Sequence, residues 1–352
     1  MNQLKQHWIA IGFSSWKKPF ITDFLPPESH VSFWSYRKLR AKCKQLSAVK
    51  VVVWSSKASP ELIAFCNQHC LPLWRMEDGF IRSVGLGVDL VRPVSLVLDS
   101  TGIYYDSSST SDLETMLNTH TFNSSILSRS RELIHLITHS RISKYNIGFS
   151  SKLNLPQDKT IILVPGQVEA DASILKGSPY MKTNLSLLTT VREQNPDAFI
   201  IYKPHPDVLA GGRDGKAFES QLTPYDLRVT DISITDLFEQ VDELHTMTSL
   251  AGFEALLRGV KVVTYGLPFY AGWGLTTDHC SCDRRQRKLS VEELVAGTLL
   301  LYPVYVDPAT CQRITCEQAI GSVKSSLGSP KGPRLSTRID RLVRRTLGMK
   351  RV

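Results

Sequence analysis

The sequence predicts an α/β protein in which two Rossmann-like lobes face a cleft. Short apolar segments alternate with longer amphipathic segments along most of the chain, and this alternation favours parallel sheets covered by helices. The expected strands are residues 8–13, 31–34, 51–54, 71–76, 95–98, 160–164, 199–202, 243–246 and 261–265. Ser111 with Glu114, and Ser290 with Glu293, have the spacing of capping boxes and indicate two helix starts.

The length of 352 residues suits two domains of roughly 150 residues each. The polar, serine-rich segment 129–157 looks like the connection between two sheets. We therefore expect an N-terminal Rossmann-like domain at residues 1–150, a second one at 151–310, and C-terminal helices with a basic tail at 311–352.

Composition excludes several classes of protein. The N-terminus lacks the apolar core of a signal peptide, and no apolar run approaches membrane-spanning length. The seven cysteines are scattered without Cys-x-x-Cys spacing, which argues against a disulfide framework or a zinc site and favours a reducing cytoplasm.

Most of the net charge of +9 lies at the C-terminal end. Residues 324–352 contain nine Lys or Arg and a single acid, Asp340, so the other residues together carry only about +1. Leu335, Ile339, Leu342 and Leu347 recur at near-helical spacing, which predicts a basic amphipathic helix suited to the anionic inner surface of a membrane. The body has no evident basic stripe, so nucleic acid is a less favoured partner. A solvated tail with no partner is the alternative.

An apolar run at residues 260–265 opens at Gly266 into a loop that holds Phe269, Tyr270 and Trp273. Loops at the carboxyl ends of parallel strands are where open α/β sheets bind ligands. We interpret these aromatic side chains as the wall of a site for a sugar or nucleotide. A turn-rich β-hairpin is the alternative.

Two acidic clusters also follow expected strands. Glu77 and Asp78, with Arg82 nearby, could act as a general base or hold sugar hydroxyls, or could form a solvated turn. The second cluster comprises Gln167, Glu169 and Asp171. A carboxylate there could attack an anomeric carbon, although Asp171 or Ser173 could equally be a helix N-cap.

Two further clusters suit a phosphate. In Lys203-Pro-His-Pro-Asp207, the prolines fix a lysine beside an imidazole, and the alternative is a structural histidine. Thr248 and Ser249 lie at an expected helix start, where free backbone N–H groups and hydroxyls could bind a phosphate while Glu254 reaches ribose hydroxyls. A plain helix cap would have the same sequence.

Together these motifs resemble one family. Glu77-Asp-Gly-Phe-Ile-Arg-Ser-Val-Gly-Leu-Gly, Gln167-Val-Glu-Ala-Asp-Ala-Ser, Lys203-Pro-His-Pro, Thr248-Ser-Leu-Ala-Gly-Phe-Glu-Ala-Leu-Leu-Arg-Gly and Pro268-Phe-Tyr-Ala-Gly-Trp-Gly-Leu occur in order. They are similar to motifs of the bacterial capsule-polysaccharide β-Kdo glycosyltransferases of the KpsC type. Gly12-Phe-Ser-Ser-Trp-Lys-Lys-Pro-Phe resembles the start of a module in that family, and the resemblance runs from about residue 9 to residue 305.

The resemblance implies a GT-B-like enzyme that transfers Kdo from CMP-β-Kdo, with retention of configuration, to a Kdo-terminated or lipid-linked glycan. Family members commonly carry two modules in tandem, and one is present here. The implied localisation is cytoplasmic and peripheral to the inner membrane, with other capsule-synthesis proteins as further partners. The alternatives are a transferase of the same fold that uses CMP-sialic acid or a UDP- or GDP-sugar, and a non-catalytic glycan- or lipid-binding module.

The resemblance also assigns residues, with Asp171 as the nucleophile. The expected catalytic residues are Asp171, His205, Glu77 and Asp78. The expected donor-binding residues are Gln167, Glu169, Lys203, His205, Thr248, Ser249, Glu254, Tyr270 and Trp273, and the expected acceptor or sugar contacts are Trp16, Lys17 and Arg82. The base for the acceptor hydroxyl stays open among Glu77, Asp78 and Glu169. No cluster has metal-ligand spacing, so we expect no metal and no cofactor besides the donor substrate.

Overall fold

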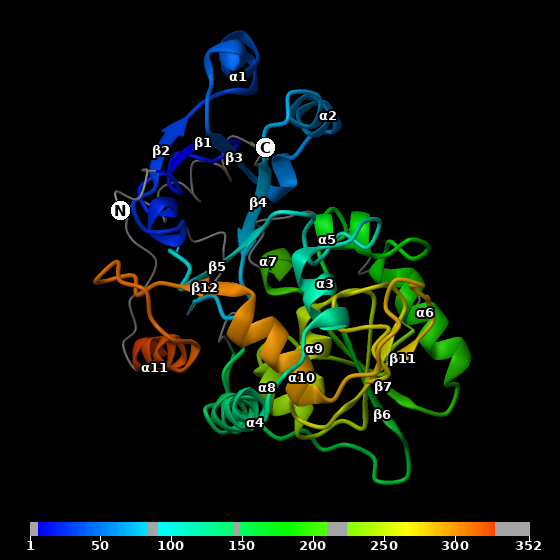
Figure 1. Ribbon diagram of the computed structural model, residues 1–352. Coiled ribbons are helices and arrows are strands. Elements are labelled where there is room, and N and C mark those ends of the chain that lie inside the picture. Colours follow the sequence, from blue (N-terminus) through cyan, green and yellow to red (C-terminus); the bar gives the residue numbers. More distant parts are fainter. Residues whose placement is uncertain (1–5, 84–90, 144–147, 210–223, 328–352) are drawn as a thin grey trace, which may run out of the picture.

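The computed structural model describes residues 6–83, 91–143, 148–209 and 224–327. It contains two six-stranded sheets, each packed against helices (Figure 1). This arrangement confirms the predicted α/β class, and all nine expected strands are present. The basic segment 328–352, which the sequence predicts to be an amphipathic helix, lies outside the described residues. Within them, no helix is both long and apolar enough to cross a membrane.

The first sheet has the strand order β12-β5-β4-β3-β1-β2. Its strands are β1 (His7–Ile11), β2 (His30–Phe33), β3 (Val49–Trp54), β4 (Leu73–Asp78), β5 (Ser95–Asp99) and β12 (Pro303–Tyr305). Strands β1 to β4 pair in parallel, whereas β5 is antiparallel to both of its neighbours, β4 and β12. The expectation of parallel pairing therefore holds for β1 to β4 and is wrong for β5 and β12. The backbone bonds from Gly79 N–H to Ser95 and from Val94 N–H to Arg82 continue the antiparallel pairing beyond β4.

The second sheet is entirely parallel, in the order β11-β10-β9-β6-β7-β8. Its strands are β6 (Ile161–Pro165), β7 (Phe199–Lys203), β8 (Leu227–Arg228), β9 (Glu243–Thr246), β10 (Lys261–Thr264) and β11 (Thr277–Asp278). Strand β6 is buried on both faces, with Ile161 and Leu163 in one apolar cluster and Ile162 and Val164 in another. A strand covered on both sides explains its continuous apolar sequence.

The α-helices are α1 (Tyr36–Lys42), α2 (Pro60–Gln68), α3 (Asp112–Thr119), α4 (Ser124–His139), α5 (Ala172–Gly177), α6 (Asn184–Gln194), α7 (Pro206–Leu209), α8 (Ile234–Phe238), α9 (Leu250–Leu256), α10 (Val291–Val295) and α11 (Cys316–Leu327). A π-helical turn, Ala296–Leu301, extends α10, and single 3-10 turns lie at Ile21–Phe24, Cys43–Gln45 and Ser55–Lys57. Both predicted caps are confirmed as helix starts. Ser290 and Glu293 form the full reciprocal box, whereas Ser111 caps α3 while the carboxylate of Glu114 bonds to arginines instead.

The segment 129–157, predicted to be a connection, is in part a helix. Helix α4 continues to His139 and buries Leu133 and Ile137. Its serines and charged residues lie mostly on the opposite side, so the average polarity of the segment concealed its amphipathic pattern.

The two lobes share one core. Helices α3 and α4 pack against α10 and its π-helical extension, and one apolar cluster contains residues that follow β5, such as Leu113 and Leu133, together with Leu163 and Phe253 of the second lobe. Strand β12 lies within the range predicted for the second domain, 151–310, yet it pairs with β5 of the first sheet. The chain therefore crosses between the lobes more than once.

The fully buried ring of Tyr270 packs against helix α9. Its hydroxyl donates to the Ser249 carbonyl at 2.5 Å. A Cβ added at Gly252 would overlap this hydroxyl. At Gly321 of α11, a Cβ would meet no atom within 4 Å.

We predict opposite effects of the same substitution at these two helical glycines. Gly252→Ala should lower the free energy of unfolding by about 1–3 kcal/mol, the usual cost of overpacking a core. Gly321→Ala should raise it by up to about 1 kcal/mol, because alanine has the higher helix propensity. Urea unfolding of both variants tests this, and equal stabilisation by the two would contradict the close contact between Gly252 and Tyr270.

Candidate active site

A carboxylate from each lobe lies where the two lobes meet. Glu77 is near the end of β4, and Asp171 immediately precedes α5. Burial raises the pKa of Glu77 to about 7, and the neighbouring charge of Asp78 adds to this shift. The Lys17 ammonium opposes it, whereas the negative charge of Asp171 raises the pKa further. The structure therefore brings together three predicted site residues, Glu77, Asp171 and Lys17, from segments that are distant in sequence.

Two tyrosines of the first lobe, Tyr104 and Tyr105, belong to this region, although the sequence analysis did not identify them. Burial, followed by the charge of Glu77, raises the pKa of each phenol, and Asp171 acts on both in the same direction. Tyr104 donates its hydroxyl proton to the Asp78 carbonyl at 3.2 Å, and Tyr105 donates to Ser55 at 2.7 Å. The sequence feature that could have identified Tyr104 and Tyr105 is their position shortly after the strand β5.

Asp171 is the N-cap of α5. Its Oδ1 accepts hydrogen bonds from the Ser173 amide at 3.0 Å and from the Ser173 hydroxyl at 2.9 Å. The N-cap interpretation is thus confirmed for Asp171 rather than for Ser173. Both bonds reach the same oxygen, so they hold the carboxylate in one orientation.

Gln167 links the ends of β6 and β9. Its Oε1 accepts from the Thr246 hydroxyl at 3.1 Å and from the Thr248 amide at 3.0 Å, and its Nε2 donates to Thr248 Oγ1 at 3.0 Å. Glu169 likewise bonds within the lobe, because its Oε1 accepts from the Asn184 amide at 2.8 Å, at the start of α6. In this structure Gln167 and Glu169 hold the loops in place.

The loop after β7 lies against the loop after β6. The Gly166 amide donates to the Lys203 carbonyl at 2.8 Å. A Cβ added at Gly166 would lie 3.2 Å from the backbone nitrogen of His205. His205 Nδ1 accepts from the Asp207 amide at 3.1 Å, so a neutral ring carries its proton on Nε2.

Lys203 is held by backbone carbonyls. Its Nζ donates to Ile232 at 2.6 Å and to Thr230 at 3.3 Å. Burial lowers the pKa of this ammonium, and the nearby charge of Asp231 opposes the shift. In the structure Lys203 therefore fixes the segment after β8.

The expectation of free backbone N–H groups at the start of α9 is wrong for three amides. The Thr248 amide donates to Gln167, the Ser249 amide to Thr246 Oγ1 at 3.2 Å, and the Ala251 amide to Ser249 Oγ at 3.2 Å. Side-chain oxygens in the turn satisfy these donors. Glu254, 8% exposed on α9, acts electrostatically on Arg258 and Tyr270.

The aromatic loop after β10 belongs to the core, so its interpretation as a ligand wall is corrected. Tyr270 and Trp273 have no exposed surface, and Phe269 has 6%. Trp273 Nε1 donates to the Phe269 carbonyl at 2.8 Å. The buried guanidinium of Arg285, which the sequence analysis did not single out, donates to the carbonyls of Pro268 and Ala271. The loop satisfies its polar groups internally.

Among the expected acceptor contacts, Arg82 is only 2% exposed. Its Nε donates to Asp78 Oδ2 at 2.8 Å, and its Nη1 donates to Ser83 Oγ at 2.9 Å. Arg82 thus orients Asp78, and its burial corrects the expected contact with a sugar. Trp16 and Lys17 are partly exposed, with the Lys17 ammonium over the Trp54 ring.

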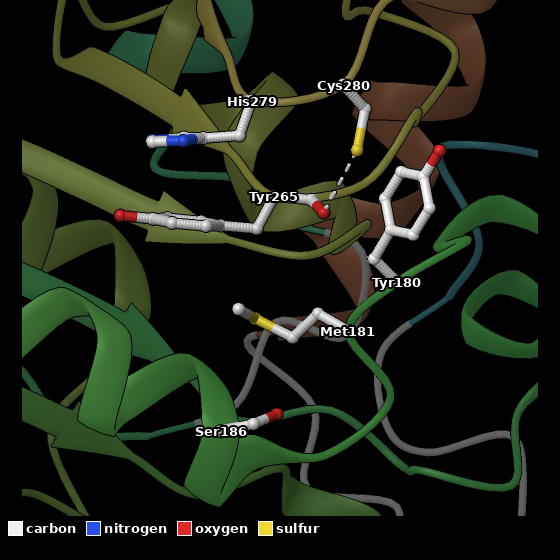
Figure 2. A pocket seen from close by; sticks show the side chains of 6 residues that line it. All are labelled: Tyr180, Met181, Ser186, Tyr265, His279 and Cys280. Atoms are coloured by element: carbon white, nitrogen blue, oxygen red, sulfur yellow. Dashed lines mark hydrogen bonds between the residues drawn. The ribbon is translucent and has the colours of Figure 1, made fainter.

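A pocket of about 240 Å³ lies elsewhere in the second lobe (Figure 2). Its lining residues are Tyr180, Met181, Ser186, Tyr265, His279 and Cys280. The His279 and Tyr265 rings stack at 4.2 Å between centroids. No residue predicted for the site lines this pocket. Among the described residues, no group of three or more His, Cys, Asp or Glu side chains could hold a metal ion.

Comparison with known proteins places these observations in a family. The family model described as "Capsule polysaccharide biosynthesis protein" matches residues 49–306. Capsule polysaccharide modification protein LipA of Neisseria meningitidis serogroup A is 46% identical over 320 residues, covering 90% of this chain and 45% of LipA. Lipopolysaccharide-processing protein LpsZ of Rhizobium meliloti is 37% identical, covering 90% of this chain and 73% of LpsZ. The chain thus spans less than half the length of LipA.

Two solved structures are similar over nearly the whole chain. The β-Kdo 2,7 transferase of Thermosulfurimonas dismutans KpsC is 39% identical, with a TM-score of 0.74, and the match covers 92% of this chain and 100% of that one. The β-Kdo 2,4 transferase of the same KpsC is 31% identical, with a TM-score of 0.80, covering 90% and 97%. These matches confirm the fold and the family that the motifs predicted.

The raised pKa of Glu77 predicts a pH-dependent loss of stability. The folded state keeps the Glu77 proton to a higher pH than the unfolded chain does, so this contribution is lost as pH rises from about 5 to about 7. Glu77→Gln removes the effect. The free energy of unfolding of the variant relative to the wild type should therefore rise by about 1–3 kcal/mol across this window.

Asp171→Asn provides the control. Because the charge of Asp171 raises the pKa of Glu77, the pH-dependent gain from Glu77→Gln should be smaller in the Asp171→Asn background. Urea unfolding at several pH values measures both differences. An identical gain in the two backgrounds would mean that the carboxylates do not sense each other across the lobes.

Proposed function

The chain belongs to the KpsC-type family of capsule polysaccharide biosynthesis proteins, and from this premise we propose that it is a retaining β-Kdo glycosyltransferase. The donor is CMP-β-Kdo, and the acceptor is a Kdo-terminated or lipid-linked glycan. The two similar KpsC structures are named as β-Kdo transferases, which supports Kdo as the sugar that is transferred. The observation that carries the proposal is the pair of carboxylates from opposite lobes, Asp171 and Glu77, within electrostatic reach of each other.

Asp171 is the proposed nucleophile. A carboxylate oxygen of Asp171 attacks the anomeric carbon, and the bond from that carbon to the CMP phosphate oxygen breaks, so CMP leaves with the electron pair. The acceptor oxygen then displaces Asp171 from the same carbon. Two inversions give net retention. The bonds from Ser173 support this role, because a nucleophile held in one orientation loses little entropy on reaction.

Glu77 is the proposed base for the acceptor hydroxyl. A group that removes a proton works best when its pKa is close to the operating pH, and the Glu77 pKa of about 7 meets this condition. The other two candidates have tighter partners, since Asp78 pairs with Arg82 and Glu169 bonds to Asn184. Glu77 also comes from the lobe that we assign to the acceptor.

His205 is the proposed donor to the departing phosphate. The Asp207 amide occupies its Nδ1, so the neutral ring can donate only through Nε2. Preorganised donors of this kind stabilise charge that develops on a leaving group. Lys203 and Gln167 then act by holding the loops around the phosphate, while Ser249 and Glu254 lie on the ribose side. No cofactor or metal enters this scheme.

The proposed location is the cytoplasmic face of the inner membrane, where a lipid-linked acceptor is available. The basic segment 328–352 supports this through its charge and apolar spacing alone. Other capsule-synthesis proteins are further proposed partners.

We expect Asp171→Asn to abolish transfer while preserving the fold, because asparagine also caps helices well but cannot form the glycosyl-enzyme bond. Transfer is measured by NMR of the product from CMP-Kdo and a short Kdo-terminated glycolipid. The matched control is Asn123→Ala, which removes the N-cap of α4, costs about 1 kcal/mol of stability and should leave transfer intact. Substantial transfer by folded Asp171→Asn would exclude the nucleophile, whereas a mass increase of one Kdo on the peptide containing Asp171 would support it.

His205→Ala and Glu254→Gln should each weaken CMP binding by roughly 10- to 100-fold, because each removes a hydrogen bond to or from a charged group. Isothermal titration calorimetry with CMP measures the change. The control is His279→Ala, which alters the separate pocket (Figure 2) and should leave CMP affinity unchanged. Unaltered affinity in both site variants would place the donor elsewhere.

A further inference from the structure

A basic segment occurs in the first lobe, far from the C-terminal tail. Residues 29–60 contain seven Lys or Arg and no Asp or Glu. The near-zero net charge of the body conceals this segment, so the expectation that the body lacks a basic stripe is wrong. The seven residues are Arg37, Lys38, Arg40, Lys42, Lys44, Lys50 and Lys57.

The first five of these cations form what we call the α1 surface. Arg37, Lys38, Arg40 and Lys42 lie on α1, Lys44 lies on the 3-10 turn that follows, and all five are exposed. Leu39 is the buried residue of this helix. Helix α1 stands at the end of the first lobe, at the opposite end of the molecule from α4 (Figure 1). Within the described part of the chain, no ion pair involves any of the five.

Aromatic side chains border the α1 surface. The Lys38 ammonium lies 4.7 Å from the centroid of the Trp34 ring, and the Arg40 guanidinium lies 5.9 Å from that of Tyr36. Both rings are half-buried at the base of the helix. Trp and Tyr next to Lys and Arg are typical of the boundary between water and lipid headgroups, where amphipathic rings and long cationic side chains are both favourable.

We propose that the α1 surface binds an anionic phospholipid membrane. Its cations are spread over the exposed side of α1 and the turn that follows it, so they suit an extended negative surface better than a single phosphate or carboxylate. The segment itself contains no acidic residue, and the neighbouring acid Glu61, at the start of α2, contacts α1 through its backbone carbonyl, which accepts from Tyr36 at 3.1 Å. Each cation at such a surface increases the partition coefficient by a factor of about five. This inference does not depend on the transfer reaction.

Sedimentation of the full chain with vesicles tests the proposal. The vesicles are phosphatidylcholine with or without phosphatidylglycerol. The α1 variant combines Arg37→Gln, Lys38→Gln, Arg40→Gln and Lys42→Gln, and because these side chains are exposed we expect an unchanged circular dichroism spectrum and Tm. Its partition onto phosphatidylglycerol vesicles should fall by at least about tenfold, and the remaining difference from the wild type should shrink as salt is added.

A charge-matched control separates this surface from net charge. Arg131→Gln, Lys152→Gln, Lys159→Gln and Lys288→Gln remove four exposed cations elsewhere and should change vesicle binding by less than about threefold. A third variant neutralises Arg338, Arg341, Arg344 and Arg345 of the tail, again in the full chain, to measure the contribution of that segment.

Three results would overturn the proposal. The first is wild-type vesicle binding by the α1 variant. The second is an equal loss in the α1 variant and in the charge-matched control. The third is a loss confined to the tail variant. If, in the first case, the α1 variant also binds an anionic oligosaccharide more weakly than the wild type does, the α1 surface is assigned to a glycan and not to the membrane.

Discussion

The contact between Arg285 and Glu114 fixes the geometry on which the site depends. Arg285 belongs to the second lobe and Glu114 to α3, and both side chains are almost fully buried. The Glu114 carboxylate bonds to Arg285 at 3.0 Å and to Arg284 at 2.7 Å, while Arg285 also holds two carbonyls of the loop after β10. A buried pair gains little net stability from its charges, but it is costly to break and it specifies one arrangement. That arrangement places Tyr270 against α9 and therefore sets the position of Ser249.

The same loop supports the first lobe beneath Glu77. The Phe269 ring lies 4.7 Å from that of Phe80, and Phe80 lies 4.7 Å from Tyr104. Aromatic rings from both lobes pack in this region, and burial is the largest cause of the rise in the pKa of Glu77. The lobes thus meet through a shared core instead of an open hinge. A carboxylate pair drawn from two lobes needs such a rigid base to keep its spacing.

The sequence predicted the strands and the clusters at their carboxyl ends because these depend on local pattern. The nine expected apolar segments are strands, and Asp171 and His205 follow strands as expected, whereas Glu77 lies at the end of β4 itself. The failures involve long-range partners. From sequence, Tyr270 and Trp273 look like the wall of a ligand site. In the structure, Arg285 bonds to their loop and to Glu114, which is distant in sequence, and both rings are buried. Strand β5 likewise has a partner, β12, that comes from the other end of the chain. The average polarity of residues 129–157 concealed α4, and the net charge of the body concealed the α1 surface.

Net charge is a poor guide to the surface of this protein because opposite charges occupy different places. The +9 total directs attention to the tail, although the α1 surface in the described part of the first lobe also carries five exposed cations. A field near a surface is determined by charges within about one Debye length, roughly 10 Å at moderate salt, so acids on another face do not cancel those on α1. In the proposed reaction, the lobe that carries α1 also supplies Glu77. If the first lobe binds the membrane, a lipid-linked acceptor lies on the same side as the proposed base, and the donor binds to the second lobe.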